Sequence, residues 1–145
     1  MFQRLLLAVD GSQGSLKAAA TAAEIARRFG SRVTLAHVMH MSDAVRAATS
    51  IAGVAGPEWA SGVWDKQAKE IVQEARKAIG LPDDQVKEEI LVGHPAEMIC
   101  RAAEEGSYDL IIMGSRGLSE VSAFFLGSVS DKVSHHAHCP VLLVR

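Results

Sequence analysis

The chain has 145 residues, of which 48% are apolar, and its 15 basic and 17 acidic residues give a net charge of −2. At about 150 residues per domain, this length predicts one domain over residues 1–145, large enough to fold without a metal or a disulfide. The balanced charge and the aromatic content of 5% argue against a nucleic-acid-binding surface, so we expect no nucleic-acid partner.

The first apolar run, from Leu5 to Val9, is too short for a signal-peptide core or a membrane span. The two cysteines, Cys100 and Cys139, form no CxxC motif. We therefore expect a cytoplasmic protein that has no membrane partner and whose thiols are small buried hydrophobic groups.

Apolar segments follow strand and helix patterns in turn along the chain. The predicted elements are a strand at 5–9, a helix from Ser12 or Ser15 to Phe29, a strand at 32–39, a helix at 64–79, a strand at 86–92, a helix at 95–105, a strand at 109–113, a helix at 128–136 and a strand at 141–144. Residues 41–63 have weak periodicity, and we expect them to form a long connection, partly helical and mobile.

The first helix is expected to pack closely on a sheet, because its inward face is rich in alanine. At helical spacing this face comprises Leu16, Ala19, Ala20, Ala23, Ala26 and Phe29. Gly30 suits the left-handed residue that often follows a helix.

Strands that alternate with helices indicate right-handed crossovers and a parallel sheet covered on both faces. The pattern predicts an α/β fold with a five-stranded parallel sheet, of the Rossmann-like kind. Ligands of open α/β sheets bind beyond the carboxyl ends of the strands. The residues that directly follow each strand are therefore the candidates for a site.

A pair of glycine-containing turns follows the fourth predicted strand. Two residues separate Gly114 from Gly117, and nine more separate Gly117 from Gly127-Ser128 at the start of a helix. Glycines let the backbone approach a ligand closely, and a helix N-terminus favours an anion. The hydroxyls of Ser128 and Ser130 would add donors. Neither the P-loop pattern GxxxxGK[ST] nor GxGxxG is present.

The spacing G-x2-G-x9-G-S resembles the nucleotide-binding motif of the universal stress protein family. Other segments resemble the same family: LLLAVDGS its first strand and acidic turn, VTLAHVM its second strand, GHPAEMICRAA its third crossover, DLIIMGSRG its fourth strand, and GSVSDKVSHHAHCPVLLVR its last helix and strand. The resemblance covers nearly the whole chain. One branch of the family lacks these glycines and does not hold ATP, whereas this chain keeps them.

The resemblance implies a five-stranded, adenine nucleotide α-hydrolase-like fold that holds ATP, or AMP or ADP, across the strand ends. Mg²⁺ or Mn²⁺ would be bound through the phosphates and not by protein side chains. The residues it implies as nucleotide-binding are Ala8, Val9, Asp10, Val38, Met113, Gly114, Ser115, Arg116, Gly117, Gly127, Ser128, Val129 and Ser130. Asp10 would lie near the ribose, and the Val38 backbone would meet the adenine edge.

Several of these residues have structural alternatives. Asp10 is also suited to accept hydrogen bonds in the turn before the first helix. Arg116 is either a phosphate contact or an ordinary solvated arginine. The run from His135 to His138 suggests a metal site, but histidines at a helix C-terminus also interact favourably with the helix dipole.

The favoured function is an ATP-binding regulatory module of a stress response, with hydrolysis that is slow at most. The alternatives are a slow ATP-hydrolysing enzyme and an interaction module that binds AMP or no nucleotide. No catalytic residue is predicted, because the loop has no lysine and only His94 and His37 lie near the site by strand-end position. The family also implies a homodimer through Val141–Val144, which has the pattern of an apolar edge strand, and a regulatory protein partner whose identity is unknown.

Overall fold

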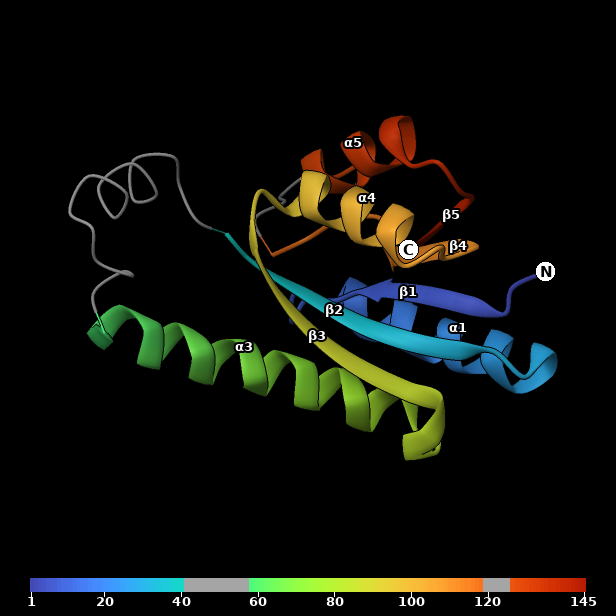
Figure 1. The fold of residues 1–145 in the computed structure, drawn as a ribbon, viewed down its shortest axis with the longest axis horizontal. Helices are drawn as coiled ribbons and strands as arrows, with labels where there is room; N and C mark the ends of the chain where they lie inside the picture. Colours follow the sequence, from blue (N-terminus) through green and yellow to red (C-terminus); the bar gives the residue numbers. More distant parts are fainter. Residues whose placement is uncertain (41–57, 119–125) are drawn as a thin grey trace.

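The computed structural model describes residues 1–40, 58–118 and 126–145. All pairings in its single sheet are parallel, and the strand order is β3-β2-β1-β4-β5 (Figure 1). The strands are β1 (Arg4–Ala8), β2 (Arg32–His40), β3 (Val86–Gly93), β4 (Leu110–Gly114) and β5 (Val141–Val144). The helices are α1 (Gln13–Phe29), α3 (Glu58–Ile79), α4 (Pro95–Glu105) and α5 (Ser128–His136), with a short 3₁₀ turn at Asp83–Gln85. The predicted α/β class and five-stranded sheet are confirmed.

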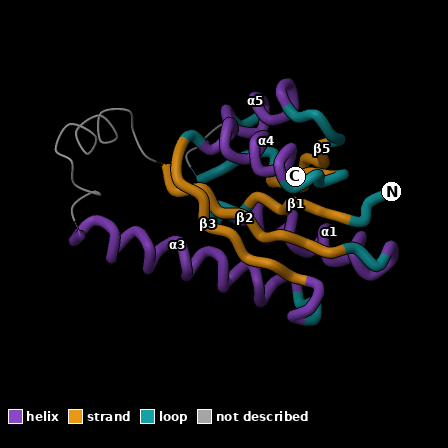
Figure 2. Tube along the Cα trace, viewed as in Figure 1, coloured by secondary structure: helices purple, strands orange, loops and turns teal. Residues whose placement is uncertain are grey.

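Helices cover both faces of the sheet, with α1 and α3 on one side and α4 and α5 on the other (Figures 1 and 2). Side chains of β1 therefore alternate between two cores. Leu5 and Leu7 pack with α1 and the end of α3, whereas Leu6 and Ala8 pack with α4 and α5. Burial on both faces explains why the sequence of β1 is a continuous apolar run.

The helix after the second strand begins earlier than the sequence pattern indicated. Helix α3 starts at Glu58, inside the predicted connection at 41–63, and not at Trp64. The rest of that connection, residues 41–57, lies outside the described residues. The inward face of this helix includes the buried residues Ala68, Val72 and Ala75.

The predicted inward face of α1 is wrong in part. The buried residues are Ser15, Ala18, Ala19, Ala22, Ala23 and Ala26. Leu16 is half-buried, Ala20 is exposed, and Phe29 is 55% exposed with an edge-to-face contact to Phe2. Small side chains let the helix lie close to the sheet. The close packing that results stabilises the fold more than burial of Leu16 and Phe29 at the helix ends would. Gly30 adopts the predicted left-handed conformation, with φ 67°.

The parallel arrangement gives the sheet two chemically different ends. The carboxyl ends of β1, β2 and β4 meet the N-termini of α1, α4 and α5, while the amino ends meet the helix C-termini. Within the described residues, no helix is long and apolar enough to cross a membrane.

Candidate functional site

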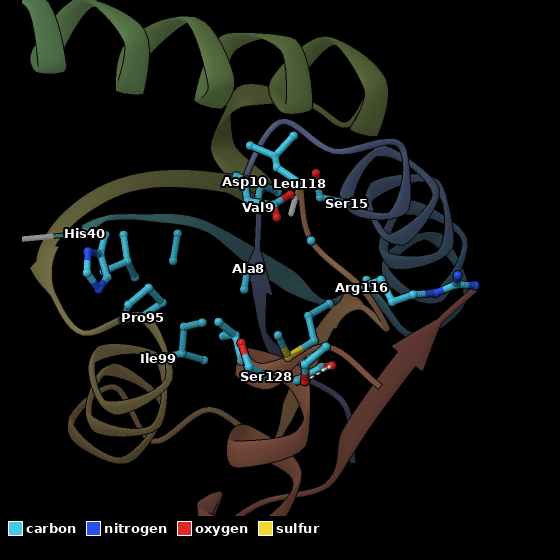
Figure 3. Close-up of a pocket in the computed structure, with 18 residues that line it drawn as sticks. Ala8, Val9, Asp10, Ser15, His40, Pro95, Ile99, Arg116, Leu118 and Ser128 are labelled. Atoms are coloured by element: carbon cyan, nitrogen blue, oxygen red, sulfur yellow. Dashed lines mark hydrogen bonds between the residues drawn. The ribbon is translucent and has the colours of Figure 1, made fainter. Parts of the chain in front are cut away.

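A cavity of about 340 Å³ lies at the carboxyl ends of β1, β2 and β4 (Figure 3). This volume falls within the range of about 300–1,000 Å³ that is common for small-molecule pockets. All the residues that the family resemblance implied line the cavity, except Ser115. The further lining residues, which sequence reasoning missed, are Ser15, Ala36, His40, Pro95, Ile99 and Leu118.

One half of the cavity has apolar walls. Val38 from β2, Ile99 from α4 and Met113 from β4 line it, together with Ala8 and Ala36. Ile99, Ala36 and Met113 are almost fully buried in the core between the sheet and α4, so their positions are fixed by packing. Such a surface suits a flat apolar ring with a polar edge.

The other half is built mainly from backbone. Gly114 and Gly117 follow β4, and Gly127 and Ser128 open α5. Gly127 has φ −63° and ψ 149°, a conformation open to any residue, and it provides no side-chain cap for α5. Its lack of a Cβ is therefore not a requirement of backbone geometry, and it leaves the N-terminus of α5 accessible from the cavity.

Gly117 leaves room for the Asp10 carboxylate, which would have to shift to accommodate a side chain at this position. A Cβ at position 117 would lie 2.8 Å from Oδ2 of Asp10, closer than any real side chain allows. The other carboxylate oxygen, Oδ1, accepts a hydrogen bond of 2.9 Å from the Ser12 backbone N–H. Asp10 therefore stabilises the turn before α1, as one of its two interpretations predicted, and it also lines the cavity.

Ser12, rather than Ser15, is the N-cap of α1. Its Oγ accepts a hydrogen bond from the Ser15 backbone N–H at 3.1 Å. Gly14, in the first turn, packs directly against Gly114, because a Cβ on Gly114 would lie 2.9 Å from the Gly14 carbonyl carbon. This contact sets α1 close to β4 at the cavity.

Ser115 and Ser130 hold the two glycine segments together. The Ser115 carbonyl accepts a hydrogen bond of 2.8 Å from the Gly127 N–H and one of 2.7 Å from the Ser130 hydroxyl. The Ser130 oxygen also lies 3.0 Å from the Gly127 carbonyl. Both acceptors are carbonyls, so the Ser130 proton is committed within the protein. The expectation that this hydroxyl donates to a ligand does not fit the structure.

Arg116 lines the cavity, but its side chain extends away from the other labelled side chains in Figure 3. The position of Arg116 between two glycines in the sequence does not indicate the direction of its side chain. Ser128, in contrast, lies at the cavity wall on the first turn of α5.

Three histidines lie near the ends of β2 and β3, and only one of them lines the cavity. His37 donates a hydrogen bond of 2.8 Å from Nδ1 to the Val9 carbonyl, and His94 precedes α4. The lining residue is His40, whose ring meets that of His94 edge to face with centroids 5.6 Å apart. Strand β2 ends at His40, one residue beyond the strand predicted at 32–39, and His40 lines the cavity.

The run from His135 to His138 does not share one helical face, because α5 ends at His136. His135 and His136 each donate from Nδ1 to the carbonyl four residues earlier, at 2.8 Å and 2.7 Å. Among the described residues, no group of three or more His, Cys, Asp or Glu side chains is placed to hold a metal ion. These contacts favour the interpretation as a helix C-terminus.

Cys100 and Cys139 are half-buried rather than fully buried, and they pack on the core between the sheet and α4. Burial raises the pKa of both thiols. They are therefore protonated at neutral pH and poorly nucleophilic.

Comparison with known proteins gives a consistent result. The model of the "Universal stress protein family" matches residues 1–145. A universal stress protein of Thermus aquaticus is 39% identical over 145 residues, which cover all of both chains. A universal stress protein from Archaeoglobus fulgidus in complex with dAMP is 25% identical, with all of both chains covered and a TM-score of 0.71. A universal stress protein in complex with cAMP is 26% identical, with a TM-score of 0.66. The match covers 99% of this chain and 96% of that chain.

Proposed function

The chain belongs to the universal stress protein family, and we propose that it is a regulatory module of a stress response that binds ATP in the cavity at the carboxyl ends of β1, β2 and β4. The observation that carries the proposal is the division of one cavity into an apolar half and a half formed by glycine backbone and a helix N-terminus. An adenine ring fits the first and a phosphate chain fits the second.

Two relatives support the choice of adenine. The solved structures with dAMP and with cAMP contain ligands that share the adenine base but differ in sugar and phosphate. In this chain, the apolar walls at Val38, Ile99 and Met113 would hold the base, with Asp10 close to the ribose. The phosphates would then extend toward Gly117, Gly127 and the first turn of α5.

Mg²⁺ or Mn²⁺ would be bound mainly by phosphate oxygens. Asp10 is the one carboxylate among the described residues that line the cavity, and Oδ1 of Asp10 already accepts a hydrogen bond from Ser12. This donor set suits a hard cation that keeps oxygen ligands from a phosphate chain and from water. When bound, the cation would neutralise phosphate charge.

The test is binding of ATP, ADP and AMP, with and without Mg²⁺, measured by isothermal titration calorimetry. In the Gly127→Val variant we expect the affinity for ATP to fall about tenfold or more, because the side chain fills the space before α5 while the backbone conformation suits valine. Ala20→Val places the same side chain on the exposed side of α1 and serves as the control. If Gly127→Val binds ATP as well as the parent, the proposed phosphate path is wrong.

We expect any hydrolysis of bound ATP to be slow. No lysine is among the described lining residues, and Arg116 extends away from them. Efficient phosphoryl transfer needs such charges at the transferring group. Unchanged ATP after hours of incubation, followed by chromatography, would support a binding role, whereas accumulation of ADP that Asp10→Ala abolishes would indicate an enzyme.

We also propose a cytoplasmic homodimer that pairs through β5. This strand lies at the edge of the sheet, and its four side chains, from Val141 to Val144, are half-buried. The carbonyls of Pro140 and Val144 accept hydrogen bonds from β4, so the alternation along a strand directs the N–H of Leu143 outward. Leu143→Pro removes that donor, and we expect monomers in analytical ultracentrifugation, while the control Leu143→Ala remains dimeric. A dimeric Leu143→Pro variant would contradict pairing through this edge.

A further inference from the structure

A second hollow, of about 750 Å³, lies at the opposite, amino end of the same strands. We call it the amino-end shelf and define it by Arg4 of β1, Arg32 and Thr34 of β2, Lys87 of β3, and Tyr108, which precedes β4. Arg4 and Ala8 stand at opposite ends of β1, about 13 Å apart at 3.3 Å per residue. The shelf is therefore separate from the nucleotide cavity at the carboxyl ends.

The shelf lies on the face of the sheet that carries α4 and α5. Arg4 alternates with Leu5 and points to the same side as Leu6, which packs against those helices. The amino-terminal halves of β2 and β3 extend beyond α4 in Figure 1, and the side chains of Arg4, Arg32 and Lys87 are exposed there. This corner of the sheet thus presents charged groups to solvent where a helix would otherwise cover it.

Arg4 and Arg32 carry like charges at directly opposite positions. They are register partners on β1 and β2, and within the described part of the chain neither side chain forms an ion pair. Like charges directly opposite on neighbouring strands destabilise a sheet. A bound anion between the two guanidinium groups would remove that repulsion.

Lys87 adds a third cation that is partly neutralised. Glu89 raises the pKa of Lys87 through a hydrogen bond and its charge, whereas Arg4 acts in the opposite direction. The Arg4 charge is thus close enough to Lys87 to affect it. Glu89 already pairs with Lys87, so the two arginines are the groups left to bind an anion.

The structure holds Arg4 in place from two sides. Its guanidinium carbon lies 5.3 Å from the centre of the Tyr108 ring, and the Tyr108 hydroxyl donates a hydrogen bond of 2.7 Å to Oγ1 of buried Thr34. The Arg4 backbone N–H donates to Oδ1 of Asp109 at 3.2 Å, and its carbonyl accepts from the Asp109 N–H at 3.0 Å. The hydrogen bonds fix the Arg4 backbone and the ring contact restricts its guanidinium, so Arg4 loses less freedom on binding a ligand than an arginine without these contacts.

We propose that the amino-end shelf binds a phosphate dianion between the guanidinium groups of Arg4 and Arg32. Each guanidinium offers a planar fork that matches phosphate oxygens. Two unpaired arginines are neutralised by about two negative charges, which a phosphate group carries near pH 7 and a single carboxylate does not. Asp84, on the rim of the hollow, disfavours a larger anion that would extend toward the 3₁₀ turn.

The proposal is tested by titration of the full chain with inorganic phosphate, followed by ¹H–¹⁵N NMR. We expect saturable shifts at the backbone amides of Arg4, Arg32 and Lys87. The R4Q/R32Q variant should lose affinity at these amides by about tenfold or more. The R28Q/R101Q variant removes the same charge from two exposed arginines that pair with glutamates on α1 and α4, and it should bind like the parent.

The NMR shifts separate the shelf from the nucleotide cavity, because phosphate bound in the nucleotide cavity would shift the amides of Gly127 and Ser128 instead. Shifts only at those amides, or equal affinity at the shelf in R4Q/R32Q, would overturn the proposal. Succinate that binds the shelf as tightly as phosphate would overturn the assignment to phosphate. Arg32→Lys serves as a second variant in case R4Q/R32Q folds poorly. The lysine keeps the positive charge but lacks the planar guanidinium, so we expect the affinity for phosphate to fall severalfold.

Discussion

The two ends of the sheet offer an anion different groups. At the carboxyl end a cavity with apolar walls adjoins the two glycine segments and the N-terminus of α5, and the Gly127 N–H is already bonded to the Ser115 carbonyl. At the amino end the polar groups are the exposed side chains of Arg4 and Arg32, above Tyr108. The strands are the same, so the difference arises from the structure that adjoins each end. Helix N-termini adjoin the carboxyl end, whereas the amino end has an uncovered corner of the sheet.

This contrast has consequences for sequence change. Backbone groups cannot be removed by substitution, and the carboxyl-end cavity is altered mainly when a glycine gains a side chain. At the amino end each charge belongs to one replaceable residue, and exposed charges are screened by salt. Binding at the shelf should therefore weaken more with ionic strength than binding in the cavity.

The largest effect is expected for Gly114→Val. Its Cβ would lie 2.9 Å from the carbonyl carbon of Gly14 and 3.1 Å from the backbone nitrogen of Ser15, and backbone atoms cannot move aside cheaply. We expect the free energy of unfolding in urea to fall by about 3 kcal/mol. Gly127→Val should lose less, because Gly127, although buried, has a backbone conformation that suits valine. Equal losses would mean that the two glycines have the same role.

A smaller effect is expected for Tyr108→Phe at the amino end. The variant loses the hydrogen bond to Oγ1 of Thr34, a residue that is only 6% exposed. Its free energy of unfolding in urea should therefore fall by about 1–2 kcal/mol. It keeps the ring beneath Arg4, so affinity for phosphate should stay within about twofold. Tyr108→Leu removes both features, and if it retains the parent's phosphate affinity, the ring does not position Arg4.

The smallest effect is expected for Ser130→Ala. The Ser115 carbonyl keeps its hydrogen bond from Gly127, and the Gly127 carbonyl keeps one from Asp131, so no buried acceptor is left without a donor. We expect a loss of about 1 kcal/mol in stability. Calorimetry should show a smaller drop in ATP affinity than for Gly127→Val. A larger drop would indicate that the hydroxyl contacts the ligand.

Much of the fold is determined by local patterns. The buried parts of β1 and β4 are apolar because both of their faces are covered, and the ends of α5 and β5 are those that the sequence predicted. The inward face of α1 was predicted less well, because hydrophobicity favours Leu16 and Phe29 over the smaller Ala18 and Ala22. A short distance between the helix and the sheet requires small residues at the contact. A hydrophobicity pattern carries no information about that distance.

The candidate site was predictable as a set of positions but not as a set of contacts. The glycine spacing placed Gly117 and Gly127 at the cavity, yet nothing in it indicated that the Ser130 hydroxyl is committed to Ser115. His40 was missed because the end of β2 was placed too early. The shelf was missed altogether, since Arg4 and Arg32 become neighbours only through the register of β1 and β2.

The position of β1 in the middle of the sheet has a consequence for synthesis on the ribosome. β1 pairs on one side with β2 and on the other with β4, so that Leu5 meets Leu110. At about 5–20 residues per second, the second edge of β1 waits several seconds for its partner to be made. For that time the apolar part of β1 has an open edge, which is a site for aggregation. The carboxyl-end cavity also needs residues 127–130, which are made after β4, so a ligand bound there comes too late to protect that edge.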